Sequence, residues 1–254
     1  MLFGHRGASG ECPENTLPAF ERALAQGAMA IETDVHRSRD GEVVVFHDAD
    51  LARTTNASGP IAERTLAELR ELDAGYHFSP DGGPSTPFRG RGVRISTLGE
   101  VFDALPAVPI NVEIKASDPE LIEATLDLVA PRADRTLVAA AEDDTMAALR
   151  AALARRPFEP AMGASVGDVL GFVRAALGEG EAPPEPMALQ IPPDFGGQPL
   201  VTPELLAFAQ GRGVHVHVWT VNDPAEMKRL LELGVDGVMS DFPARLIQVA
   251  GGVG

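Results

Sequence analysis

Residues 31–48 read Ile31-Glu-Thr-Asp-Val-His-Arg-Ser-Arg-Asp-Gly-Glu-Val-Val-Val-Phe-His-Asp48, an apolar strand pattern that carries two acids and then turns back. In a strand, residues two apart share one face, so Glu32 and Asp34 would occupy one small volume. Two carboxylates held together repel, and a bound divalent cation would remove that conflict. An Asp40-Gly41 turn then predicts a short returning strand that leads to His47. A Glu-x-Asp pair on an exposed edge strand would explain this stretch alone, so the rest of the chain has to decide.

Strand and helix patterns alternate around this stretch. We predict eight strands, each followed by a helix, at residues 1–6, 28–35, 109–115, 136–140, 160–164, 186–191, 214–219 and 235–239. Asn15 or Thr16 is suited to cap the first helix, and Pro203 and Pro224 stand at first helical positions. Eight such units in about 250 residues predict an α/β fold, the (β/α)8 TIM barrel. An open doubly wound sheet is the alternative, although no Gly-x-Gly-x-x-Gly follows an early strand.

The alternation is interrupted between about residues 48 and 92. The run from Ser79 to Gly92 is rich in Gly, Pro and Ser and reads as loop, while Thr65 to Leu72 has the pattern of one short amphipathic helix. A connection of this length is unusual inside a compact unit. We therefore predict a single domain, 1–254, with a segment inserted at about 48–92 after the second strand.

The composition is that of a globular chain with a strong negative charge. The formal net charge of −16 argues against nucleic acid as a partner and against stable association with anionic membranes. A small anionic substrate is still compatible with this net charge, because a bound cation and a nearby Arg or Lys can make the electrostatic potential of one pocket positive. Cys12 is the only cysteine, no signal-peptide pattern is present and no apolar run reaches transmembrane length, so we expect a cytoplasmic protein.

Three of the predicted strands place polar residues on one face and β-branched residues on the other. The polar faces carry Glu32 and Asp34 in one strand, Asn111, Glu113 and Lys115 in the next, and His215, His217 and Trp219 near the C-terminus. In a TIM barrel one face of each strand points to the axis, and chemistry takes place where the strands end. We therefore expect one mouth to gather His5, Glu32, Asp34, Glu113, Lys115 and Trp219.

These residue types suit metal-assisted chemistry on an anion. Three carboxylates without a nearby thiol favour Mg²⁺ or Ca²⁺ over zinc. His5 and His47 are suited to act as a general acid and base pair, and Arg6 and Lys115 would attract an anionic substrate. Single members have structural alternatives, since Lys115 can neutralise the acids and Trp219 can serve packing alone. His215 and His217 are better explained as core residues than as ligands.

The motifs together resemble the glycerophosphodiester phosphodiesterase family. The match runs in order along nearly the whole chain, through His5-Arg6-Gly7, Pro13-Glu-Asn-Thr16, Glu32-x-Asp34-Val35, Asp40-Gly41, His47-Asp48, Glu113-x-Lys115, Trp219-Thr-Val-Asn222 and Asp236-Gly237. The resemblance implies a (β/α)8 barrel with a small insertion after the second strand, and hydrolysis of glycerophosphodiesters to an alcohol and sn-glycerol 3-phosphate. It implies that one divalent cation, Mg²⁺ or Ca²⁺, is bound by Glu32, Asp34 and Glu113.

The remaining roles follow from the same resemblance. It implies His5 and His47 as general acid and base, Arg6 and Lys115 at the phosphoryl oxygens, and Trp219 beside the glycerol or alcohol. The chain departs from the family after the fourth strand, where many members carry Ser-Phe and this one reads Ala139-Ala-Ala-Glu142. That departure affects the pocket wall and hence substrate preference.

Several functions stay open at this stage. We expect a soluble diester with a small alcohol, and the inserted segment is a candidate lid over the mouth. Lysophospholipase D-type hydrolysis of lysolipids is the nearest alternative. A non-catalytic barrel that binds a phosphorylated metabolite is another, although the chain keeps both the acids and the histidines. A barrel enzyme that stabilises an enolate with its metal is a third.

Overall fold

Eight parallel strands form the centre of the computed structural model, which describes residues 1–184 and 186–253. The strands are β1 (Leu2–His5), β2 (Ala30–Arg37), β4 (Ile110–Ile114), β5 (Thr136–Ala139), β6 (Ala161–Met162), β7 (Ala188–Ile191), β10 (His215–Val218) and β11 (Gly237–Ser240). Their order in the sheet is β6-β5-β4-β2-β1-β11-β10-β7, and a parallel bridge from Gly163 to Ala188 joins the two ends. This is a nearly closed barrel, so the predicted (β/α)8 fold is confirmed and the open doubly wound alternative is wrong.

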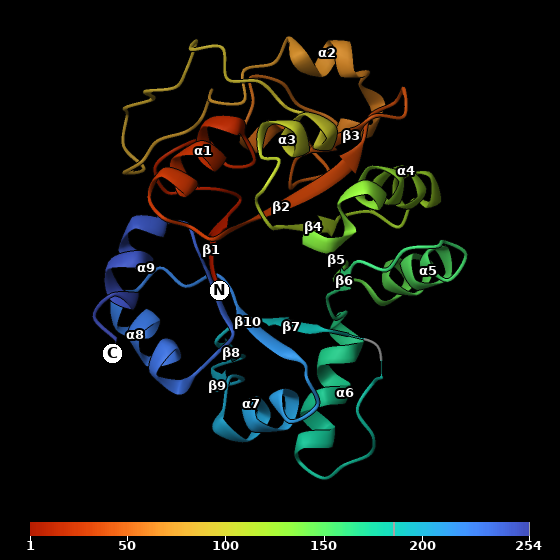
Figure 1. Cartoon of the computed structure of the whole chain (residues 1–254). Helices are drawn as coiled ribbons and strands as arrows, with labels where there is room; N and C mark the ends of the chain where they lie inside the picture. The colour runs from red at the N-terminus through yellow and green to blue at the C-terminus, as the bar shows by residue number, and fades with distance from the viewer. Residues whose placement is uncertain (185, 254) are drawn as a thin grey trace.

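A ring of helices surrounds the strands (Figure 1). The helices that follow the eight strands are α1 (Leu17–Ala25), α3 (Leu98–Ala104), α4 (Pro119–Val129), α5 (Asp143–Leu153), α6 (Val166–Ala176), α7 (Pro203–Gln210), α8 (Pro224–Leu233) and α9 (Pro243–Ala250). Side-chain caps fix several of their starts, as at Thr97 and Ser165, where full capping boxes form. The described part of the chain contains no helix that is long and apolar enough to cross a membrane.

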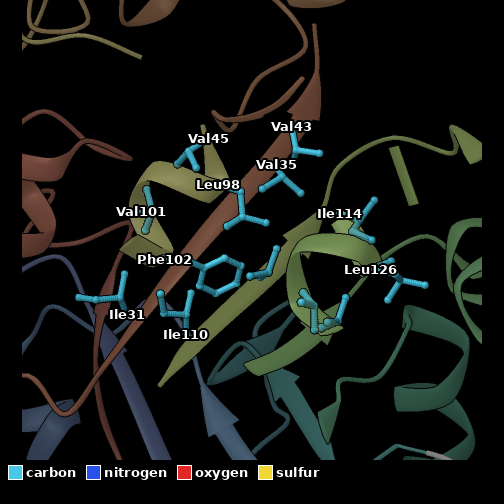
Figure 2. Close-up of a cluster of buried hydrophobic side chains, with 14 of the residues drawn as sticks. Ile31, Val35, Val43, Val45, Leu98, Val101, Phe102, Ile110, Ile114 and Leu126 are labelled. Atoms are coloured by element: carbon cyan, nitrogen blue, oxygen red, sulfur yellow. The ribbon is translucent and has the colours of Figure 1, made fainter. Parts of the chain in front are cut away.

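The alternation in β2 and β4 separates the core from the barrel axis. Ile31 pairs with Ile110 and Val35 with Ile114, and these side chains pack against α3 and α4 around Phe102 (Figure 2). The alternating residues Glu32 and Asp34 of β2 point the other way, and the register pairs Asp34 with Glu113 on the axial side. Because the side-chain period of a strand is two, burying the aliphatic face fixes the acids toward the axis.

The segment between β2 and α3 has its own small core. β3 (Val43–Val45) returns antiparallel to β2 through a turn in which Gly41 has a φ of 94°, followed by η1 (Leu51–Arg53), η2 (Ile61–Glu63) and α2 (Leu66–Arg70). The cluster that joins these pieces comprises Val44, Phe46, Leu51, Ile61, Leu69, Ala74, Val93 and Ile95. The segment therefore has a buried core of its own, and the pairing of β3 with β2 joins it to the barrel.

Several short features were not predicted from the sequence, among them η1 and η2. A hairpin of β8 (Asp194–Phe195) and β9 (Gln198–Pro199) follows β7, and η3 (Ala130–Arg135) follows α4. Strands of two residues are too short to leave a period-two pattern, and a single 3₁₀ segment leaves no helical repeat.

Candidate active site

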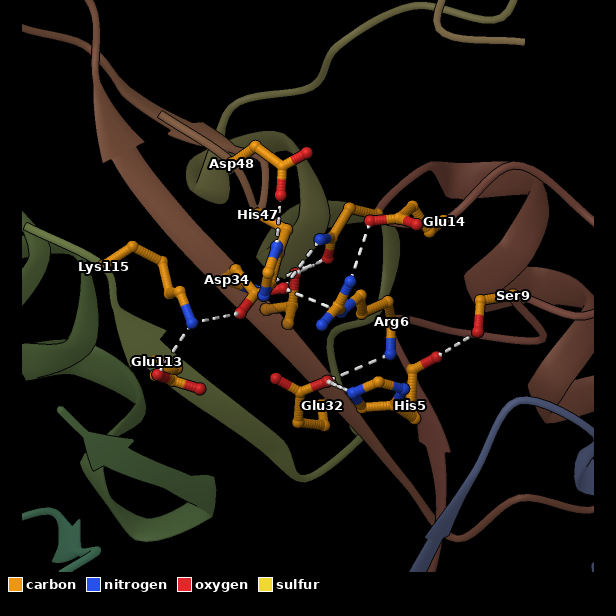
Figure 3. Close-up of polar contacts among 12 residues, drawn as sticks. His5, Arg6, Ser9, Glu14, Glu32, Asp34, His47, Asp48, Glu113 and Lys115 are labelled. Atoms are coloured by element: carbon orange, nitrogen blue, oxygen red, sulfur yellow. Dashed lines mark hydrogen bonds and ion pairs between the residues drawn. The ribbon is translucent and has the colours of Figure 1, made fainter. Parts of the chain in front are cut away.

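Three acids meet at the carboxyl ends of β2 and β4 (Figure 3). Single oxygen atoms of Glu32, Asp34 and Glu113 all lie within 4.8 Å of one another. Glu32 and Asp34 are almost fully buried, at 4% and 1% exposure. The parity of the strands produces this cluster, because Glu32 and Asp34 are two apart in β2 and Asp34 pairs with Glu113 across the sheet.

The cluster carries more negative charge than its own cations neutralise. Burial, and after it the charge of Asp34, raise the pKa of Glu32 to about 8. Lys115 Nζ lies 2.9 Å from Glu113 Oε1 and 3.6 Å from Asp34 Oδ1, and Arg6 Nε lies 3.3 Å from Asp34 Oδ2. The raised pKa means that Glu32 holds a proton at neutral pH, and a divalent cation bound between the acids would favour its ionised form. Three oxygen donors suit a hard cation. The residues present therefore fit such an ion.

Asn15 orients the most buried of the acids. Its Nδ2 donates to Asp34 Oδ2 at 2.9 Å, and Thr33 Oγ1 donates to Asn15 Oδ1 at 2.7 Å. Asn15 is buried with a φ of 56°, in the left-handed region that asparagine tolerates better than most residues. The sequence suggested Asn15 or Thr16 as a helix cap. Thr16 occupies the N-cap position of α1, and Asn15 fixes a carboxylate instead.

His5, the last residue of β1, forms a dyad with Asp241. Its Nδ1 lies 2.7 Å from Asp241 Oδ1, and its Nε2 lies 3.9 Å from Glu32 Oε2. Asp241 also accepts hydrogen bonds from Ser9 Oγ and Asn222 Nδ2, both at 2.7 Å. Burial alone would lower the pKa of His5 and raise that of Asp241. The hydrogen bond and the opposite charges of the pair have the larger effect, so the pKa of His5 is raised and that of Asp241 falls to about 2. The imidazole is thus held by an ionised carboxylate.

His47 forms a second dyad, just beyond β3. Its Nδ1 lies 2.6 Å from Asp48 Oδ1, and its backbone carbonyl contacts Nε2 of the buried His36 at 3.0 Å. Although burial alone would raise it, the pKa of Asp48 falls to about 2 because Arg53 and His47 contact the carboxylate. In both dyads a carboxylate holds Nδ1, so Nε2 is the ring nitrogen left for the cavity.

All eight residues nominated from the sequence line one cavity of about 180 Å³. One side is charged, with the acids, the histidines, Arg6 and Lys115. The lining also includes small or neutral side chains, namely Ala139, Ala140, Ala141, Ala164 and Gln190. Trp219 lies just beyond β10 at the rim and is 41% exposed. The lining of the cavity therefore combines charged side chains that suit an anion with small, uncharged ones.

The two remaining histidines of β10 lie away from this mouth. His215 and His217 line a different cleft together with Met1 and Phe3, at the amino ends of the strands. His217 is buried with its ring 5.0 Å from that of Phe3, and burial lowers its pKa to about 4. It is a core residue, as expected, but its Nδ1 has no hydrogen-bond partner among the described residues.

Comparison with known proteins gives a consistent result. The glycerophosphoryl diester phosphodiesterase family model matches residues 5–245. A glycerophosphodiester phosphodiesterase of Caldanaerobacter subterraneus subsp. tengcongensis is 30% identical, over 98% of this chain and 97% of that protein. A lysophospholipase D of Mus musculus is 28% identical, over 96% of this chain and 84% of that protein.

A solved structure agrees in fold and in length. A phosphodiesterase of Oleispira antarctica, in complex with the product sn-glycerol 3-phosphate, has a TM-score of 0.78 at 26% identity and covers 99% of this chain and 96% of its own. The family match spans both histidine dyads and all three acids. The chain therefore belongs to the glycerophosphoryl diester phosphodiesterase family, a family of hydrolases, which confirms the resemblance carried by its motifs.

Proposed function

We propose that this chain hydrolyses glycerophosphodiesters to an alcohol and sn-glycerol 3-phosphate, and that it needs a divalent cation to do so. One observation carries the proposal: three acids, two histidine–aspartate dyads and two cationic side chains line the same small cavity. The product bound to the related Oleispira antarctica phosphodiesterase supports the substrate class. We further propose that residues 1–254 act as one barrel domain, with the segment at about 48–92 inserted beside the mouth.

In this proposal the acids hold one cation, Mg²⁺ or Ca²⁺, through Glu32, Asp34 and Glu113. When bound, the ion would polarise the phosphate and help to ionise a substrate hydroxyl. Asn15 keeps Asp34 oriented before the ion arrives, because its amide already occupies Oδ2 at 2.9 Å. Binding a cation would also remove the reason for Glu32 to hold a proton.

The side chains of this protein then handle the protons and the charge. One histidine of the pair His5 and His47 accepts the proton of the attacking glycerol hydroxyl, and the other donates a proton to the oxygen of the leaving alcohol, which leaves a cyclic phosphodiester. With the two roles exchanged, water then attacks phosphorus and opens the ring to sn-glycerol 3-phosphate. Arg6 and Lys115 bind the phosphoryl oxygens, because both carry their charge toward the cavity. Trp219 covers the carbon atoms of the glycerol or alcohol at the rim.

The proposed activity should depend on added metal. We expect turnover of glycerophosphocholine to stop when the protein is stripped with EDTA and to return on adding Mg²⁺ or Ca²⁺, because the ion is the group proposed to polarise the phosphate. Release of choline and of sn-glycerol 3-phosphate would be measured separately, with circular dichroism to confirm that the stripped protein stays folded. Full activity in metal-free protein would contradict the cation. Product binding without turnover of any diester would favour a phosphometabolite-binding barrel.

We also expect a preference for small alcohols. The cavity is only about 180 Å³, and the net charge of −16 disfavours anionic lipid surfaces. Glycerophosphocholine should therefore have a kcat/KM at least about tenfold above that of a lysophosphatidylcholine held below its micelle threshold, a difference of about 1.4 kcal/mol. The mouse relative named lysophospholipase D makes the lysolipid the proper competitor. A clear preference for it would identify the second candidate, lysophospholipase D activity, as the function.

A further inference from the structure

We propose that Arg53, in the segment inserted after β2, is a positioning residue that fixes both His47 and Arg6. It is the last residue of η1, outside every strand of the barrel. Its Nη1 and Nη2 donate to the two carboxylate oxygens of Glu14, at 2.6 and 2.7 Å, and its Nε donates to Asp48 Oδ2. One guanidinium thus joins two carboxylates that belong to different parts of the mouth.

Each of those carboxylates holds a residue of the proposed machinery (Figure 3). Asp48 Oδ1 contacts His47 Nδ1 at 2.6 Å, and Glu14 Oε1 accepts from Arg6 Nη1 at 3.0 Å. Arg53 is therefore two contacts from the imidazole on one side and two contacts from the phosphate-binding guanidinium on the other. The inference rests on the proposed function, because it assigns Arg53 a task only if His47 and Arg6 act on the diester.

Charge explains why both contacts depend on Arg53. Without it, Glu14 would have Arg6 as its remaining partner among these contacts and would draw that side chain away from Asp34 and the cavity. Asp48 would keep only His47 and would be free to rotate toward solvent. The ring could then exchange between tautomers, since the proton on Nδ1 is fixed by the carboxylate. We expect the first change to weaken substrate binding and the second to slow the chemical step.

Lysine cannot replace this arrangement. All three guanidinium nitrogens donate hydrogen bonds, Nη1 and Nη2 to Glu14 and Nε to Asp48. A lysine ammonium is a single point charge and cannot match two carboxylates in this geometry. The Arg53 side chain is also 46% exposed, so a small guanidinium ion can reach its place from solvent.

A purely structural role is the competing explanation, and the same segment supplies the control. Arg70 in α2 donates to Glu100 in α3 at 2.6 Å, so it also joins the segment to the barrel through an ion pair. Its side chain is 41% exposed, close to the value for Arg53, but it touches no residue of the cavity. The segment also keeps its own buried core around Leu51, Ile61 and Leu69. Losing either arginine should therefore leave the segment folded.

The test compares the full-length variants Arg53→Ala, Arg53→Lys and Arg70→Ala with glycerophosphocholine and saturating cation. We expect Arg53→Ala to lower kcat by roughly 10- to 100-fold and to raise KM, as is usual for groups that orient a site residue. Arg53→Lys should recover little of this loss, and Arg70→Ala should match the parent chain. Added ethylguanidinium should restore activity to Arg53→Ala, whereas ethylammonium should not.

A second readout does not need activity. Imidazole ¹⁵N shifts, with the His47 signal assigned by its loss in His47→Gln, should report one fixed tautomer in the parent chain and in Arg70→Ala, and an averaged signal in Arg53→Ala. If no diester is turned over by the parent chain, the proposed function fails while these shifts still decide the positioning role. If Arg53→Ala and Arg70→Ala behave alike in kinetics, rescue and ¹⁵N shifts, the inference is wrong.

Discussion

Replacing Glu113 with Gln is expected to abolish cation dependence and to lower kcat/KM for glycerophosphocholine by at least about 10³-fold. A cation that polarises a phosphate contributes several kcal/mol to the transition state, and each 1.4 kcal/mol corresponds to a factor of ten. The substitution keeps the size of the side chain and removes one of three charges that lie within 4.8 Å of one another. The remaining pair would bind Mg²⁺ or Ca²⁺ weakly, because the ion would keep only two charged ligands.

The same substitution should leave the fold intact. Glu113 contributes to the raised pKa of Glu32, so removing its charge relieves repulsion in the cation-free protein. Lys115 Nζ, now 2.9 Å from Glu113 Oε1, can still donate to the amide oxygen of Gln. We therefore expect a Tm in EDTA that is no lower than that of the parent chain, and cation affinity measured by calorimetry that falls sharply.

A control variant lies in the same β–α unit. Glu120 lies in the first turn of α4, the helix that follows β4, and pairs with Arg37 at 2.8 Å outside the cavity. Glu120→Gln also removes one negative charge, so it tests whether net charge alone alters the kinetics. Undiminished activity in Glu113→Gln would remove the three-acid site from the proposal, and a loss in Glu120→Gln of similar size would point to a general electrostatic effect.

The acid cluster was predictable because it depends on a short-range rule. Glu32 and Asp34 are two residues apart, and the aliphatic residues of the opposite face, Ile31 and Val35, are buried, so the strand itself fixes where the acids point. Glu113 required one more assumption, that the next parallel strand pairs in register, and the pairing of Asp34 with Glu113 satisfies it. The barrel was predictable because the apolar residues repeat with the periods of strands and helices, which allowed eight strand–helix units to be counted.

The groups that orient the site were not predictable in this way. Asp241 holds His5 because β1 and β11 are neighbours, yet the two residues are 236 positions apart in the chain. Arg53 lies in a 3₁₀ turn without a periodic pattern, and its partners come from two other loops. Asn15 belongs to the Pro13-Glu-Asn-Thr16 motif, but a role in capping the first helix explained its presence there equally well. Such contacts depend on how loops close in space, which a sequence pattern does not encode.

Removing either histidine of the two dyads should slow the chemical step itself. We expect His5→Ala and His47→Ala each to lower kcat for glycerophosphocholine by roughly 10²- to 10⁴-fold, the usual contribution of a positioned acid or base. KM should change less, because Arg6, Lys115 and the acid cluster remain. The measurement is steady-state kinetics at saturating cation, with His215→Ala as the control: that ring is exposed at the opposite end of the barrel and should have no effect.

The double variant separates a concerted pair from two independent contributions. In the proposed mechanism one histidine takes a proton from the attacking hydroxyl while the other gives one to the leaving alcohol, so losing either partner should already remove most of the benefit of the other. The loss in the double variant should therefore be far smaller than the product of the two single losses. If the losses multiply, the histidines act in separate steps. If one single variant keeps a near-native kcat, that histidine has a structural role, and the carboxylate that holds it, Asp241 or Asp48, stabilises the fold and takes no part in the reaction.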